Sequence, residues 1–85
     1  MDYKGLKFKW EIDEKNKKFI DYLLDNDFLI KKVKEHLSKT VYYIQKDNID
    51  TQAEILTEVK DIEAYIKLFE RQFELTKQVS NINNN

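Results

Sequence analysis

The sequence predicts a mainly α-helical fold, in which one short N-terminal β-strand is followed by three helices, the third of them long and heptad-like. Three observations lead to this prediction. Apolar residues alternate strictly over a short N-terminal segment, later apolar residues recur at helical spacing, and the chain has no proline and a single glycine. Because a chain of 85 residues buries only a small core, we expect it to be stabilised as a two-fold homo-oligomer.

The strand is expected over residues 6–12, where apolar side chains alternate with Lys7, Lys9 and Glu11. No other segment alternates as clearly, so the backbone donors and acceptors of this strand need a partner. We expect antiparallel pairing with the same strand of a second copy. Pairing with the sheet edge of another protein and packing as an irregular arm are the alternatives. The residues on the inner face of this paired strand are Leu6, Phe8, Trp10 and Ile12.

Two helices are expected next, over residues 14–25 and 28–46. Asp13 is suited to cap the first helix, because its carboxylate accepts hydrogen bonds from free backbone N–H groups. Residues 25–27 interrupt the apolar stripe and separate the two helices. Residues 47–50 include three Asp or Asn residues, which favour turns and end the second helix.

The third helix is expected over residues 51–79, where Thr51 and Glu54 match a capping box. Its apolar residues recur at intervals of four and three, which is typical of a helical seam between chains. We therefore expect an oligomerisation helix; a core helix of a bundle and a partner-binding helix are the alternatives. The seam residues are Ile55, Val59, Ile62, Ile66, Phe69 and Phe73. Residues 80–85 are polar and Asn-rich, so we expect a disordered tail.

Catalysis has little support in the sequence. His36 is the only histidine and cysteine is absent, while the acidic residues are interleaved with basic ones, as on solvated helix faces. No phosphate loop or dinucleotide fingerprint occurs. We therefore expect a protein that is not an enzyme, with no metal site and no cofactor. Because no apolar run is long enough to span a bilayer and no signal peptide is recognisable, we expect a cytoplasmic protein without membrane contacts.

The order of strand, short helix, Asx-rich turn and longer helix resembles the ribbon–helix–helix family of dimeric DNA-binding proteins over about residues 6–46. The resemblance implies that residues 1–50 form a DNA-binding unit, whose paired strands enter the major groove of double-stranded DNA. The base-reading positions would be Lys7, Lys9 and Glu11, with Lys4 in the surrounding lysine patch. The function implied is that of a small repressor, antitoxin-like protein or plasmid or phage accessory factor, acting in transcription regulation.

A second hypothesis is a helical protein-interaction module of phage or mobile-element origin, which docks on a host or cognate protein through the third helix and binds no DNA. The near-neutral net charge of −1 and the aromatic content of 13% favour it. Exposed aromatic residues are typical interface hot spots, whereas buried ones only pack the core. The candidates are Tyr42, Tyr43, Tyr65 and Phe73. In both hypotheses the chain also binds itself, as a dimer or tetramer.

Overall fold

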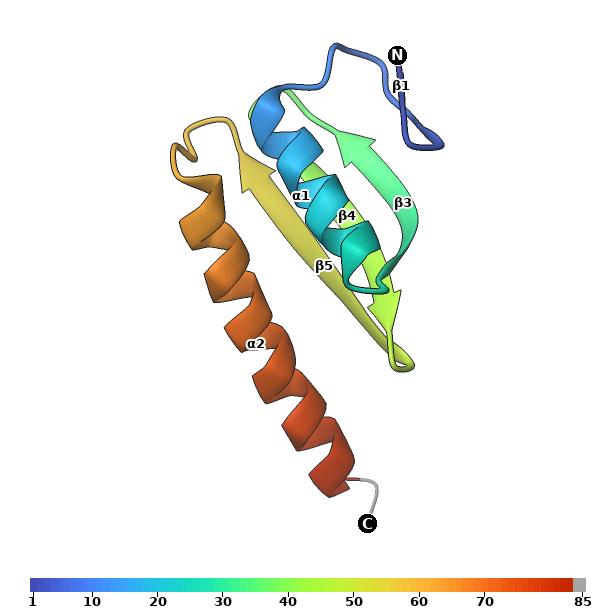
Figure 1. Cartoon of the computed structure of the whole chain (residues 1–85), viewed down its shortest axis with the longest axis vertical. Helices are drawn as coiled ribbons and strands as arrows, with labels where there is room; N and C mark the ends of the chain where they lie inside the picture. The colour runs from blue at the N-terminus through green and yellow to red at the C-terminus, as the bar shows by residue number, and fades with distance from the viewer. Residues whose placement is uncertain (84–85) are drawn as a thin grey trace.

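A computed structural model of the chain, which describes residues 1–83, has a mixed α/β fold with two helices and five strands (Figure 1). The prediction of a mainly α fold with three helices is therefore wrong. The elements in chain order are β1 (Asp2–Tyr3), β2 (Leu6–Lys7), α1 (Glu14–Asp25), β3 (Leu29–Glu35), β4 (Lys39–Lys46), β5 (Ile49–Leu56) and α2 (Ile62–Asn83).

The strands β3, β4 and β5 form an antiparallel sheet in which β4 is central. Asp47 and Asn48 connect β4 to β5 with φ angles of 53° and 64°. Positive φ at both central residues is the geometry of the two-residue hairpin turn that suits twisted strands. The helix predicted over residues 28–46 is wrong, because that segment forms β3, the following turn and β4.

The residues of β5 alternate as a strand that is buried on one face. Ala53 and Ile55 lie in the core, whereas Gln52 and Glu54 are exposed. The segment therefore forms a strand as far as Leu56, although residue Ile55 also begins the series of apolar residues at helical spacing. The capping box predicted at Thr51 and Glu54 is wrong for the same reason, since both residues lie within β5.

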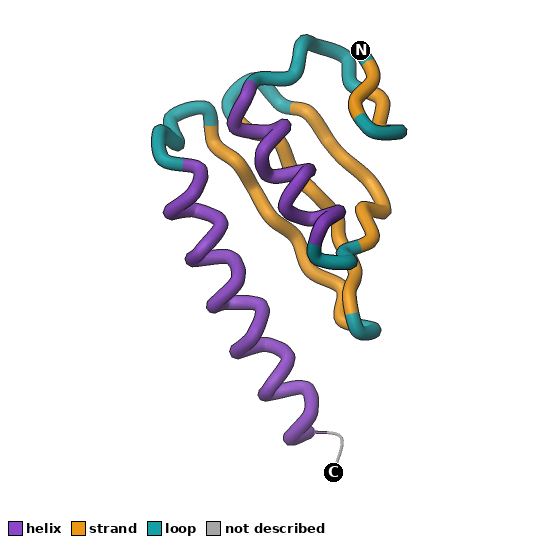
Figure 2. The backbone as a smooth tube through the Cα atoms, viewed as in Figure 1, coloured by secondary structure: helices purple, strands orange, loops and turns teal. Residues whose placement is uncertain are grey.

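The helix α1 has the predicted bounds and the predicted cap. The Asp13 carboxylate accepts a hydrogen bond of 2.8 Å from the backbone N–H of Asn16. Figure 2 shows that α1 lies across the sheet. Phe19 on this helix is fully buried and belongs to the core. The Phe19 ring lies 5.2 Å from the ring of Tyr42 in β4 and 5.5 Å from that of Phe69 in α2. Both helices thus share one core with the sheet.

The helix α2 begins later than predicted, after Asp61, whose carboxylate accepts a 3.0 Å hydrogen bond from the N–H of Ala64. The six residues predicted to form a helical seam do not share one helix, because Ile55 lies in β5 and Val59 lies half-buried in the β5–α2 loop. Ile55, Ile62 and Phe73 are buried in the core of the chain, and Ile66 and Phe69 pack against it. The helix continues to Asn83, so the tail predicted to be disordered from Ser80 is helical through that residue. Residues 84 and 85 of that predicted tail lie outside the described residues.

The N-terminal segment completes its backbone pairing within the chain. β1 and β2 form an antiparallel hairpin in which Asp2 is opposite Lys7, and the Phe8 N–H donates a 2.7 Å hydrogen bond to the Met1 carbonyl. Gly5, with φ of +87°, lies in the turn. The prediction of one strand over residues 6–12 that requires a second copy is therefore wrong. Of the four residues predicted on its inner face, Phe8 and Ile12 lie in the core, Leu6 packs against it, and Trp10 is 50% exposed.

Candidate functional site

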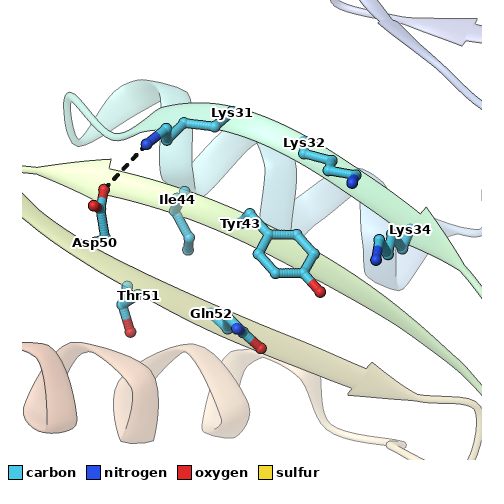
Figure 3. Close-up of a pocket in the computed structure, with 8 residues that line it drawn as sticks. All are labelled: Lys31, Lys32, Lys34, Tyr43, Ile44, Asp50, Thr51 and Gln52. Carbon is cyan, nitrogen blue, oxygen red and sulfur yellow. Dashed lines mark hydrogen bonds and ion pairs between the residues drawn. The ribbon is translucent and has the colours of Figure 1, made fainter.

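The sheet has one face against the helices and one open face. Side chains that alternate with the core residues project from the open face, and they surround a broad hollow of about 880 Å³. Figure 3 shows this face, with lysines on β3, Tyr43 on the central strand and polar residues on β5. The side chains from β3 that border the hollow are those of Lys31, Lys32 and Lys34.

Tyr43 is at the centre of this face. The register places Tyr43 opposite Lys32 of β3 on one side and Gln52 of β5 on the other. The Nζ atoms of Lys32 and Lys34 lie 5.9 and 5.6 Å from the Tyr43 ring centroid. Each contact is a cation–π interaction worth about 0.5–1 kcal/mol at an exposed position. Two ammonium groups are thus held beside one half-buried aromatic ring.

The ion pairs on this face leave two positive charges without an acidic partner. Lys31 Nζ lies 3.4 Å from the Asp50 carboxylate, and Lys39 Nζ lies 3.4 Å from that of Glu54. None of the ion pairs between described residues involves Lys32 or Lys34. The face is therefore polarised, with unpaired positive charge along β3 and carboxylates along β5.

We call the set Lys32, Lys34, Tyr43 and Gln52 the lysine–tyrosine face. Tyr43 is the one predicted hot-spot aromatic that lies on it. Tyr42 and Phe73 are buried, and Tyr65 packs against the core. Lys32 and Lys34 are not among the predicted site residues, because the sequence predicts a helix over residues 28–46. The alternation in β4 of core residues such as Tyr42 and Ile44 with Tyr43 is the signal that identifies the open face.

Two of the residues predicted to contact DNA lie on the N-terminal hairpin. Lys4 is in its turn, with its Nζ 2.7 Å from the Asp21 carboxylate of α1. Lys7 is in β2, opposite Asp2. Both belong to a hairpin formed within one chain.

The other two predicted DNA contacts, Lys9 and Glu11, follow β2 in the segment that leads to α1. The backbone N–H groups of Lys9 and Trp10 donate hydrogen bonds to the Glu35 carboxylate. This segment therefore does not form the predicted strand. The second helix of the ribbon–helix–helix layout is also replaced by β3 and β4. The predicted strand and second helix on which the ribbon–helix–helix resemblance depends are therefore wrong, whereas DNA binding itself stays a prediction.

Several groups have shifted pKa values, and each of these pKa values moves further from pH 7. The hydrogen bond from Lys4 lowers the pKa of Asp21, and Asp21 in turn raises the pKa values of Lys4 and Tyr3. Burial raises the pKa of Tyr22 to about 12 and also raises that of Tyr42. A general acid or base works best with a pKa near the operating pH, so these shifts do not favour proton transfer by these groups at pH 7. Their hydrogen bonds and packing contacts stabilise the fold instead.

The one histidine and the acidic residues of the described chain lie apart from the lysine–tyrosine face or pair with lysines. His36 is exposed in the β3–β4 turn, where its backbone N–H donates a 2.9 Å hydrogen bond to the Lys39 carbonyl. Within residues 1–83, no three His, Cys, Asp or Glu side chains come together as a metal site requires. No helix in the same part of the chain is long and apolar enough to cross a membrane.

Comparisons with protein-family models, with curated proteins and with solved structures find no match to this chain. The feature of the described chain that bears on function is therefore the open face of the sheet, where Lys32 and Lys34 lie beside Tyr43.

Proposed function

We propose that the protein is a non-enzymatic interaction module, whose lysine–tyrosine face binds an acidic segment of another protein. One observation carries this proposal: Lys32 and Lys34 hold two ammonium groups beside Tyr43 with no carboxylate partner among the described residues. Carboxylates of a partner would pair with the two ammonium groups, while an apolar side chain of the partner would pack on the Tyr43 ring. Aromatic residues at the centre of an interface commonly supply much of its binding energy.

The scaffold favours binding because it is already ordered. Tyr43 lies on the central strand, with hydrogen-bonded neighbours on both sides. The ring therefore needs no backbone rearrangement to meet a partner, and less conformational entropy is lost on binding. Gln52 adds an exposed amide that can donate and accept hydrogen bonds across the contact.

The charge distribution favours a protein over a nucleic acid. Asp50 and Glu54 lie on β5 on the same open face, where they would repel a phosphate backbone laid across the strands. Proteins that bind single strands usually stack successive bases on several aromatic side chains. Here Tyr43 is the one aromatic residue that lines the hollow. A protein segment with acidic residues over β3 fits this polarised face better.

Lysines on an edge strand also discourage strand pairing with other molecules. Such a protective role requires only charge at the edge and no specific position relative to Tyr43. The two roles therefore differ in what Tyr43 contributes: the protective role needs nothing from the ring, whereas the binding role requires it.

The proposal is tested by fluorescence anisotropy with two labelled probes of about ten residues each. One is a peptide of alternating glutamate and leucine with a central phenylalanine, and the other is oligouridylate. We expect the peptide to bind with a Kd of about 10–500 μM, and more tightly than the RNA. The double variant Lys32→Glu/Lys34→Glu should weaken peptide binding at least about tenfold, since both ammonium groups are replaced by repelling carboxylates.

The matched control is Lys18→Glu/Lys60→Glu. It changes the net charge by the same amount at exposed positions on α1 and in the loop before α2. This variant should keep its peptide affinity within about twofold, because long-range charge effects are screened at 0.15 M salt. Equal losses in the two double variants, tighter binding of the RNA, or no peptide binding at about 1 mM would contradict the proposal.

A further inference from the structure

A second, smaller pocket lies where the segment between β2 and α1 meets the β3–β4 turn. It has a volume of about 200 Å³, and Phe8, Ile12 and Asn16 form its buried side. We call it the turn pocket. It shares no lining residue with the hollow on the open face of the sheet. Sites for drug-sized ligands usually measure about 300–1,000 Å³, so the turn pocket suits a single side chain.

Two large apolar side chains border the turn pocket and remain exposed to water. Trp10 is 50% exposed and Leu37 is 92% exposed. Trp10 is also the only tryptophan of the chain. Among aromatic side chains, the indole ring attracts cations most strongly. The pocket therefore offers an accessible aromatic surface that a cationic group can cover.

The charged residues that line the turn pocket are all acidic. They are Glu11, Asp13 and Glu35, and none of them takes part in the ion pairs between described residues. The N-terminal end of α1 adds a positive potential equivalent to about half an elementary charge, which offsets only part of three carboxylates. The pocket is therefore negative, and no basic side chain lines it.

Hydrogen bonds hold two of these carboxylates in place. The Glu35 carboxylate accepts hydrogen bonds from two backbone N–H groups of the segment before α1, and the Asp13 carboxylate accepts one from the Asn16 N–H. Such bonds favour the ionised form of a carboxyl group. Burial raises the pKa of Tyr42, and the charges of Asp13 and Glu35 raise it further, so both carboxylates act on the same region of the fold.

The arrangement fits a guanidinium group better than a metal ion. Among residues 1–83, no three His, Cys, Asp or Glu side chains converge as metal ligands do. A guanidinium group is planar, so it stacks on an aromatic ring while its N–H groups donate to carboxylates around its edge. The ammonium group of lysine is compact and more strongly hydrated, so it gains less from the indole.

We propose that the turn pocket binds an arginine side chain of another protein. Its guanidinium group stacks on Trp10 and donates hydrogen bonds to the carboxylates of Glu11 and Glu35. An apolar residue next to the arginine covers Leu37. This contact uses no residue of the lysine–tyrosine face, so it goes beyond the proposed function and stands independently of it.

The fluorescence of Trp10 tests the proposal directly, because no other tryptophan contributes to the signal. The probe is a six-residue peptide with Arg-Leu at its centre and Gly and Ser elsewhere, added to the full chain. We expect a Kd of about 0.1–3 mM. Replacing the arginine of the peptide with citrulline, which keeps the shape but removes the charge, should weaken binding at least about fivefold. A lysine peptide should bind about threefold more weakly than the arginine peptide.

A pair of neutralising variants tests the position of the site. Glu11→Gln should raise the Kd of the arginine peptide about threefold to tenfold, because an exposed carboxylate that borders the pocket is lost. Asp25→Asn is the matched control, since it removes one exposed carboxylate at the opposite end of α1 and should keep the Kd within about twofold.

Three results would overturn the proposal. The first is a Trp10 fluorescence that does not change up to about 10 mM arginine peptide. The second is a citrulline or lysine peptide that binds as tightly as the arginine peptide. The third is an equal loss of affinity in Glu11→Gln and Asp25→Asn.

Discussion

The buried hydroxyl of Tyr42 donates a 2.6 Å hydrogen bond to Oδ1 of Asn16, which joins the central strand of the sheet to the first turn of α1. The side-chain amide of Asn16 in turn donates to the Asp13 carboxylate at 2.9 Å. That carboxylate also caps the helix. One chain of polar contacts thus sets the position of α1 on the sheet, and β4 presents Tyr43 on the opposite face.

Replacing Tyr42 with phenylalanine should lower the free energy of unfolding by about 1–3 kcal/mol, because Oδ1 of the buried Asn16 loses its hydrogen-bond partner. Urea unfolding followed by circular dichroism measures the change. Tyr43→Phe is the matched control and should cost less than about 0.5 kcal/mol, since Tyr43 is half-buried on the open face. Equal effects of the two substitutions would show that the contact between Tyr42 and Asn16 does not stabilise the fold.

Removing the carboxylate of Asp61 should destabilise the start of α2. Asp61→Ala leaves the Ala64 N–H without its hydrogen bond and should cost about 0.5–2 kcal/mol. Asp61→Asn should retain most of the stability, because the asparagine side chain also caps helices well. Chemical denaturation of the two variants provides the measurement. If alanine and asparagine were equivalent at this position, α2 would not begin at this cap.

The contact between Asp21 and the N-terminal hairpin should depend on pH. The pKa of Asp21 is lowered by the hydrogen bond from Lys4 and by that from the Tyr3 hydroxyl. A lowered pKa means that this contact stabilises the fold above about pH 4 and is lost as the pH falls through the pKa of the folded state. The difference in urea midpoint between the wild type and Asp21→Asn should therefore be present at pH 6 and close at lower pH. A difference that does not change with pH would refute this account.

Tyr43 should contribute to binding far more than to folding. Tyr43→Ala should weaken the acidic peptide about tenfold, whereas Tyr43→Phe should keep its affinity within about twofold, because the partner packs on the ring. Anisotropy titrations give the affinities. If alanine at this position bound as well as tyrosine, the lysines alone would account for the binding, and a protective role at the sheet edge would explain them better.

The sequence predicts α1 well because its signals are local. Asp13 caps the helix, and the apolar stripe that includes Phe19, Ile20 and Leu23 is the face that packs on the sheet. The start and end of this helix depend on residues within one turn of each end. Such features can be recognised without knowing the rest of the fold.

The strands β3 and β4 were missed because their apolar residues also fit helical spacing. A bulge between Ile30 and Lys32 shifts the alternation of β3, so that Ile30 and Val33, three residues apart, both face the helices. In β4 both faces of the strand are largely apolar, which hides the alternation between Tyr42 and Tyr43. The aromatic and β-branched content of β4 favours a strand, and so does the two-residue Asp-Asn turn that follows it.

The lysine–tyrosine face was not predictable as a unit for the same reason. Lys32 and Tyr43 are eleven positions apart in the sequence, and they become neighbours only through the register of β3 and β4. The prediction of the first strand failed for a different reason. Its pairing partner is the β1 segment at Asp2 and Tyr3, which is too short to show any alternation.

The most direct measurement is a two-dimensional ¹H–¹⁵N NMR titration of the protein with the acidic peptide. If the lysine–tyrosine face is the docking surface, the largest shift changes will fall on Lys32, Lys34, Tyr43 and Gln52. Residues on the exposed side of α1, such as Lys18, will then change little. Changes centred on α1 or α2, or spread evenly over all exposed lysines, would contradict the account.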